Sequence, residues 1–140
     1  LRKLYLAGND FKLKGAMAIA GAILHGCGLA GLHLSANKLG PAGMKVLAGA
    51  VAEMDIRRQH MLSRQGGIVI AAVKPIAIQD LHLGSISMNS QGVAALSSML
   101  VSNQSLQVLD LSNNEIDDRG IALLSQALAQ NKKIPLTTVH

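Results

Sequence analysis

Apolar residues recur along the chain at every second position and are then followed by an asparagine. The stretch "LDLSNNEI" from Leu109 to Ile116 shows the pattern, and related stretches begin at Leu1, Leu29 and Ile78. A period of two places alternate side chains on opposite faces of a β-strand. Each stretch therefore predicts a short strand that ends near the asparagine position.

A helical pattern follows each of these strands. A glycine stands six residues after the asparagine position, and apolar residues follow the glycine one, four and eight positions later. That spacing gives one apolar stripe along a helix. Helices are predicted to begin near the four glycines, which are Gly15, Gly43, Gly92 and Gly120.

The two patterns together form one repeating unit. Units start near positions 1, 29, 78, 106 and 136, so that every spacing but the second is nearly the same. Neither the strand nor the helix of one unit can bury its apolar side except against the next unit. We expect a single domain over residues 1–140 with about four to five repeats. Because it starts and stops within strands, we also expect a fragment of a longer chain or a subunit of a larger assembly.

The repeat is disturbed at residues 56–77, where the third unit starts much later than one repeat length after the second. This segment is a degenerate, shortened repeat, which we favour, or an insertion. The apolar run 68–73 predicts a degenerate helix or strand. Arg57, Arg58 and Arg64 form a candidate basic contact loop for an acidic partner or phosphate, and the alternative is an eroded repeat with solvated arginines.

The pattern Leu-x-x-Leu-x-Leu-x-x-Asn, as in "LAGLHLSANKL" from Leu29, resembles the leucine-rich repeat. With its glycine-led helix, the unit is similar to the ribonuclease-inhibitor type, as in ribonuclease inhibitors, the sensing ends of NOD-like receptors and the Ran GTPase activators. The resemblance implies an α/β solenoid, a horseshoe arc with parallel strands on the concave side and helices on the convex side. It does not identify a function, because the same repeat serves unrelated binders.

The asparagine that ends each strand has a structural interpretation. In such a solenoid its amide turns inward and hydrogen-bonds backbone groups of adjacent loops that would otherwise be buried without partners. This role is assigned to Asn9, Asn37 and Asn114. Asn113, one position earlier, is expected to face solvent. The third unit has Ile86 instead, which predicts an irregular turn.

The variable residue between the second and third leucines forms one column across the strands. Parallel strands about 4.8 Å apart place its members side by side. It predicts a partner-binding surface on the concave face, with histidines that serve as an ordinary polar contact, a pH-tuned contact or, least favoured, divalent-metal ligands. No metal site is assigned, because residues of one column do not converge on an ion. The column is Tyr5, His33, His82, Asp110 and His140, and Arg2, Lys3, Asp80 and Asn113 are assigned to the same face.

Motifs for catalysis are absent from the sequence. It has no phosphate-cradling glycine loop and no nucleophile elbow, and Asp117 and Asp118 fall where a helix begins, so that capping is their expected role. We predict a non-enzyme without a cofactor that serves as a protein–protein interaction or scaffold module. The alternative is a regulator of an enzyme by direct contact, either GTPase-activating or hydrolase-inhibiting.

The amino-acid composition limits the classes of binding partner and the cellular compartment that we expect. Tyr5 and Phe11 are the only aromatic residues, so a base-stacking platform is missing and neither nucleic acid nor a small-molecule substrate is expected, despite the net charge of +5. The single cysteine, Cys27, cannot form an internal disulfide, which favours a reducing, cytoplasmic location, and we expect it to be a small buried hydrophobe. Residues 15–34 are nearly uncharged and about long enough to cross a membrane. The repeat explains them better, and we predict no membrane span.

Overall fold

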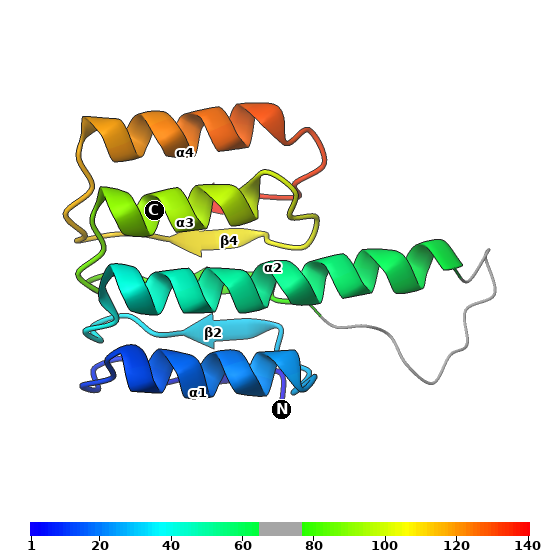
Figure 1. Cartoon of the computed structure of the whole chain (residues 1–140), viewed down its shortest axis with the longest axis horizontal. Helices are drawn as coiled ribbons and strands as arrows, with labels where there is room; N and C mark the ends of the chain where they lie inside the picture. The colour runs from blue at the N-terminus through cyan, green and yellow to red at the C-terminus, as the bar shows by residue number, and fades with distance from the viewer. Residues whose placement is uncertain (65–76) are drawn as a thin grey trace.

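A computed structural model describes residues 1–64 and 77–140 as a two-layer structure of strands and helices (Figure 1). Within these residues, five strands pair in parallel in the order β1-β2-β3-β4-β5, which is also their order along the chain. The strands are β1 (Lys3–Tyr5), β2 (Gly31–His33), β3 (Asp80–His82), β4 (Val108–Asp110) and β5 (Thr138–Val139).

Each of the first four strands is followed by a helix, and the four helices pack side by side over one face of the sheet (Figure 1). This confirms the predicted α/β leucine-rich repeat solenoid, with strands on one side and helices on the other. The opposite face of the sheet is called the strand face below. The helices are α1 (Leu13–Leu24), α2 (Gly40–Arg64), α3 (Ser90–Leu100) and α4 (Asp118–Gln130).

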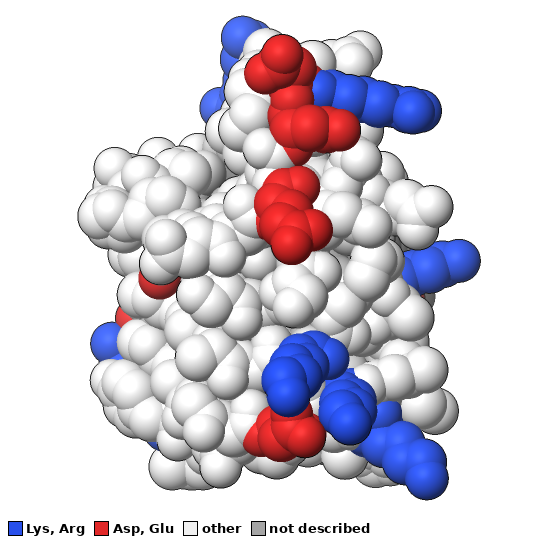
Figure 2. Space-filling view, turned by 90° about the vertical axis from the view of Figure 1, so that its left-hand side faces the viewer, with Lys and Arg blue, Asp and Glu red and all other residues white. Residues whose placement is uncertain are grey.

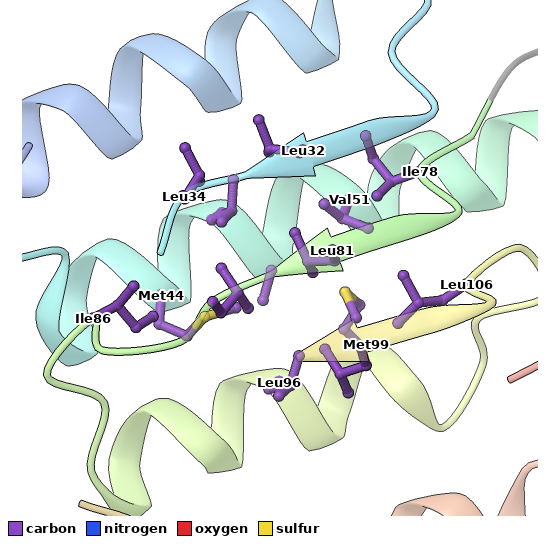
Figure 3. Packing of buried hydrophobic residues seen from close by; sticks show 14 of the residues in the cluster. Leu32, Leu34, Met44, Val51, Ile78, Leu81, Ile86, Leu96, Met99 and Leu106 are labelled. Atoms are coloured by element: carbon purple, nitrogen blue, oxygen red, sulfur yellow. The ribbon is translucent and has the colours of Figure 1, made fainter. Parts of the chain in front are cut away.

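The hydrophobic core lies between the two layers and is built one unit at a time. Leu32 and Leu81 from the strands and Leu96 from α3 are fully buried, and Figure 3 shows their side chains in this layer. At the two ends of the solenoid the same kind of residue is open to solvent, since Met17 is 55% exposed and Val139 is 46% exposed. Apolar burial at about 25 cal/mol per Å² therefore stabilises the middle units most.

The disturbed spacing between the second and third units adds no strand between β2 and β3. These two strands pair directly, with His33 opposite His82. Helix α2 continues to Arg64, past the ends of the other helices (Figure 1), so that Arg57, Arg58 and Arg64 lie on a helix and not on a loop. The predicted helix or strand at 68–73 lies outside the described residues.

Two further expectations concern burial and membranes. The prediction that Cys27 is buried is wrong, because it is an exposed free cysteine. It lies in the turn after α1 between Gly26 (φ 77°) and Gly28 (φ 72°), whose left-handed conformations form a surface turn instead of continuing the apolar stripe. Among the helices at residues 1–64 and 77–140, none has the length and apolar character needed to cross a bilayer.

Candidate functional site

The asparagine at the end of the second strand links two loops. Asn37 is 1% exposed, and its Nδ2 donates to the carbonyl oxygens of Leu34 (2.8 Å) and Leu6 (2.9 Å). Its Oδ1 accepts from the backbone N–H of Phe11 at 3.2 Å. A single side chain thus supplies partners to backbone groups of its own loop and of the preceding one.

The other asparagines of this position show how the contact depends on a neighbouring unit. Asn114 repeats the pattern, because its Oδ1 accepts from the N–H groups of Ile86 and Met88, both at 3.1 Å, and its Nδ2 donates to Leu83 O at 2.8 Å. Asn9, in the first unit, is exposed and donates only within its own loop. Asn113 is exposed, as expected.

The third turn is irregular, as Ile86 predicts. The Ile86 side chain is fully buried, and the next residue, Ser87, has a left-handed φ of 60°. A backbone hydrogen bond of 3.0 Å from Gly40 N to Ile86 O connects this loop to the preceding one. In place of an asparagine amide, this main-chain bond and a bond of 3.2 Å from Gly84 N to the Ser35 hydroxyl oxygen join the two loops.

A second pair of buried asparagines links the units before the fourth and fifth strands. Asn131 Nδ2 donates to Leu100 O and Asn103 O, both at 2.7 Å, and Asn103 Oδ1 accepts from Leu106 N at 2.8 Å. Sequence reasoning missed both residues. A signal was present, because each stands eleven positions after the helix glycine of its unit, Gly92 and Gly120.

The residues predicted as a column do lie side by side on the strand face. The register pairs Tyr5 with His33, His33 with His82, and His82 with Asp110. The Tyr5 and His33 rings are stacked with centroids 4.1 Å apart and planes inclined by 24°. The His33 and His82 rings follow at 4.0 Å and 12°. Three rings thus form one continuous stack, a contact that the sequence pattern allowed but did not specify.

The stack continues into an acidic residue on β4. His82 Nδ1 lies 3.5 Å from Asp110 Oδ2, and Asp110 Oδ1 accepts from the Ser112 hydroxyl (2.7 Å) and the Ser112 N–H (2.9 Å). Burial alone would raise the pKa of Asp110, but these hydrogen bonds and the nearby His82 lower it below its ordinary value. Asp110 therefore remains a carboxylate.

His33 lies in the middle of the stack and is held neutral. Burial lowers its pKa below the ordinary value of 6.5, and the positive charges of His82 and Lys3 lower it further. Its Nε2 is buried and has no hydrogen-bond partner among the described residues. Protonation of this ring therefore requires a counter-charge that the chain itself provides only weakly.

An ion pair lies beside the stack on the same face. Lys3 Nζ reaches across β2 to Asp80 Oδ2 at 2.8 Å, which raises the pKa of Lys3 through the hydrogen bond and the charge of Asp80. Gly31 lies between them, and a Cβ there would come within 2.9 Å of Lys3 Cγ. The absence of a side chain at this position lets the lysine cross the strand.

The remaining predicted positions are not part of the stack. Arg2 is exposed just before β1, and His140 is exposed just after β5, where the β4–β5 pairing places it next to Asp110. His25 follows α1, with Nδ1 2.7 Å from Gly21 O, and His60 is exposed on α2. Residues 1–64 and 77–140 contain no group of three or more side chains arranged to hold a metal ion.

Charged residues form two groups along the edge where strands lead into helices. Figure 2 shows a row of acidic side chains flanked by basic ones at one end of this edge, and basic side chains around an acidic one at the other. The acidic end belongs to the loop before α4, where Asp117 caps the helix by accepting from Gly120 N at 2.8 Å. At the basic end, Asp10 pairs with Lys38 (3.0 Å) and Lys12 (3.8 Å).

Comparisons with known proteins agree with this architecture. The family model described as "Leucine Rich repeat" matches residues 1–20 and 102–125. The fold is similar to a solved structure titled "Leiomodin-1 Actin-Binding Site 2 (ABS2)", with a TM-score of 0.75 and 13% sequence identity over 99% of this chain and 69% of that one. No curated protein sequence matches the chain. At this identity the likeness establishes the fold alone, which is that of a leucine-rich repeat solenoid.

Proposed function

We propose that this chain is a non-catalytic protein–protein recognition or scaffold module that binds its partner through the strand face. The proposal depends chiefly on one observation, the in-register column of Tyr5, His33, His82 and Asp110. All the described helices lie on the other side of the sheet (Figure 1), so this column faces outward. The solved neighbour is a protein whose title names an actin-binding site, which makes filamentous actin the first partner to test.

The geometry of the strand face suits recognition because its side chains are already ordered. Stacking fixes the rings of Tyr5, His33 and His82, and the Lys3–Asp80 pair fixes two charged groups. Ordering a flexible side chain on binding costs about 0.5–1.5 kcal/mol. A preorganised face avoids part of that cost.

The subtype of the repeat and the cellular location of the protein are part of the same proposal. The regular spacing of the units and the glycine-led helices support the ribonuclease-inhibitor type of repeat. The single cysteine supports a cytoplasmic location. Regulation of an enzyme by direct contact is a special case of such binding.

The test compares two variants that add the same number of carboxylates to different faces. Tyr5→Glu with His140→Glu alters exposed positions on the strand face, and Gln91→Glu with Gln126→Glu alters exposed positions on the helices. Each variant and the parent are cosedimented with filamentous actin and used to capture proteins from cell extract for mass spectrometry. Circular dichroism and urea denaturation verify that both variants fold.

We expect the strand-face variant, which places a new carboxylate at each end of the column, to lose at least about tenfold in affinity for a partner, and the helix-face variant to retain it. A partner lost only by the helix-face variant would place recognition on the helices. Retention of every partner by both variants would contradict the proposal.

A further inference from the structure

We propose that the second half of α2 is a conformational switch. In the structure, residues 53–64 continue the helix. In a second state, α2 ends near Ala52, and the side-chain amide of Asn103 connects the two neighbouring units. The inference concerns the helix layer and does not depend on recognition through the strand face. It rests on the length of α2 and on two buried polar atoms between α2 and the loop that follows α3.

Helix α2 is longer than the repeat requires. It has 25 residues, whereas the other three helices have 11 to 13. Those three helices end eight to ten residues after the glycine of their unit, but α2 ends twenty-one residues after Gly43. Its second half extends past the ends of the neighbouring helices (Figure 1). A helix that followed the other three units would end between Val51 and Glu53.

Where α3 ends, a buried asparagine of the next unit bonds the free carbonyl groups. Asn131 Nδ2 donates to Leu100 O and Asn103 O, both at 2.7 Å. The last four carbonyl oxygens of a helix have no partner within the helix, so Asn131 supplies what the end of α3 lacks. Asn103 holds the same position one unit earlier. Its expected acceptors are the carbonyl oxygens of Val51 and Met54, which correspond to those of Leu100 and Asn103.

The continuation of α2 leaves the Asn103 amide without these acceptors. Within a helix, the carbonyl oxygens of Val51 and Met54 accept from the N–H groups four residues later. Asn103 is 1% exposed, and its Nδ2 has no hydrogen-bond partner among the described residues. Asp55 is 2% exposed, and its Oδ1 also lacks a hydrogen bond there, with Arg58 Nη1 at 3.8 Å. Buried polar atoms without partners cost free energy, so the long helix carries a cost.

Polar side chains hold the second half of α2 in place against that cost. Asp55 Oδ2 accepts from Gln59 Nε2 and from Gln104 N, both at 2.8 Å. Arg57 Nη1 donates to Leu24 O at 3.1 Å. These groups are exposed or partly buried, where water competes for the same bonds. The helical state thus gains from partly solvated bonds and loses at buried atoms, which is the balance that a two-state segment requires.

The switch controls two of the arginines that the sequence indicates as a contact site. In the helical state, Arg57 is bound to Glu53 at 2.9 Å and to Leu24 O, and Arg58 lies beside Asp55. Release of the segment removes Arg57 from α1 and leaves its guanidinium open to a partner. A partner that binds the released segment therefore selects the second state.

Amide hydrogen exchange of the whole chain, followed by NMR, tests the switch. The amides of residues 56–63 are compared with those of residues 45–51 in the first half of α2. We expect residues 56–63 to exchange at least about hundredfold faster and as one unit, with protection factors that agree within about threefold. Protection that falls steadily toward Ser63 shows fraying from the helix end and overturns the inference.

Asn103→Ala separates the switch from a purely structural role of this residue. The substitution removes the amide bonds of the second state, so we expect the protection of residues 56–63 to rise about tenfold. A purely structural asparagine would loosen the loop that holds Gln104, and that protection would fall. The matched control is Asn131→Ala, which should leave residues 56–63 unchanged. Unchanged or lower protection in Asn103→Ala, or an equal rise in both variants, overturns the inference.

Ile56→Pro traps the second state, because proline removes a backbone donor and clashes with the preceding turn of a helix. Ile56 is 43% exposed, so the change removes little packing. We expect the side-chain amide protons of Asn103 to move downfield in NMR spectra, toward those of Asn131, as they gain carbonyl partners. Unchanged signals in the folded variant overturn the inference. A variant that does not fold overturns it as well, because the second state is a folded one.

Discussion

Two neighbouring turns connect their loops in different ways, because one has a polar side chain and the other an apolar side chain at the same position. Asn37 and Ile86 occupy the same position of successive units, and both are buried, at 1% and 0% exposure. The asparagine makes hydrogen bonds to the backbone of two loops, whereas the isoleucine packs in the core and makes none through its side chain. The backbone groups nearby are nonetheless connected in both turns.

The main chain replaces the amide in the turn that contains Ile86. Gly40 N donates to Ile86 O at 3.0 Å, and this contact coincides with left-handed conformations at Gly40 (φ 63°) and Ser87 (φ 60°). The comparison teaches that the repeat requires a hydrogen-bonded connection between loops and not one particular residue. The two solutions have different sensitivities to mutation, and the predictions below use that difference.

The largest effect is expected where a buried amide side chain joins two loops. Asn37→Ala leaves Leu34 O and Phe11 N without this partner, whereas Leu6 O keeps its bond from Asn9 Nδ2. Each buried group without a partner costs about 1–3 kcal/mol, so the free energy of unfolding should fall by about 3 kcal/mol. Urea denaturation followed by circular dichroism measures the change.

Asn9→Ala is the matched control, because Asn9 holds the same position but is exposed and donates only within its own loop. We expect it to lower stability by less than about 0.5 kcal/mol, as at ordinary surface positions. Equal losses in the two variants would show that burial between loops is not what makes Asn37 important.

An intermediate effect is expected when the consensus residue is placed in the irregular turn. Ile86→Asn removes a fully buried side chain from the core and introduces an amide where Gly40 N already bonds to Ile86 O. The loss of apolar burial should lower stability by about 2 kcal/mol in urea denaturation. A more stable variant would mean instead that the turn is an eroded copy that an asparagine repairs.

The repeating parts of the structure could be predicted from the sequence because every unit presents the same pattern. The strands, the helices and the neighbours within the column follow from the constant length of the unit and from a period of two within each strand. The interruption breaks the register of the repeat, yet His33 and His82 still pair, because both units retain the same strand pattern.

The parts that depend on packing between units could not be predicted in this way. The sequence places Tyr5, His33 and His82 in one column, but stacking at 4.0–4.1 Å depends on the side-chain rotamers. The exposure of Cys27 depends on a turn between two left-handed glycines. Asn103 was missed because the position eleven residues after the helix glycine is an asparagine in only two of the four units, the others having Gly26 and Met54 there.

The smallest effects test whether the left-handed glycine is part of the main-chain solution. Gly40 has φ 63°, and a Cβ there would meet no atom within 4 Å, so Gly40→Ala adds backbone strain and little else. That strain should lower the free energy of unfolding by about 1 kcal/mol.

The same helix provides a control for which we expect stability to change in the opposite direction. Gly49 lies within α2 without a left-handed φ, and a Cβ there also has open space. Alanine favours the helix interior over glycine by about 0.5–1 kcal/mol, so Gly49→Ala should raise the urea midpoint while Gly40→Ala lowers it. If both variants moved the midpoint upward, the left-handed conformation at Gly40 would not be required, and the connection through Ile86 would rest on side-chain packing alone.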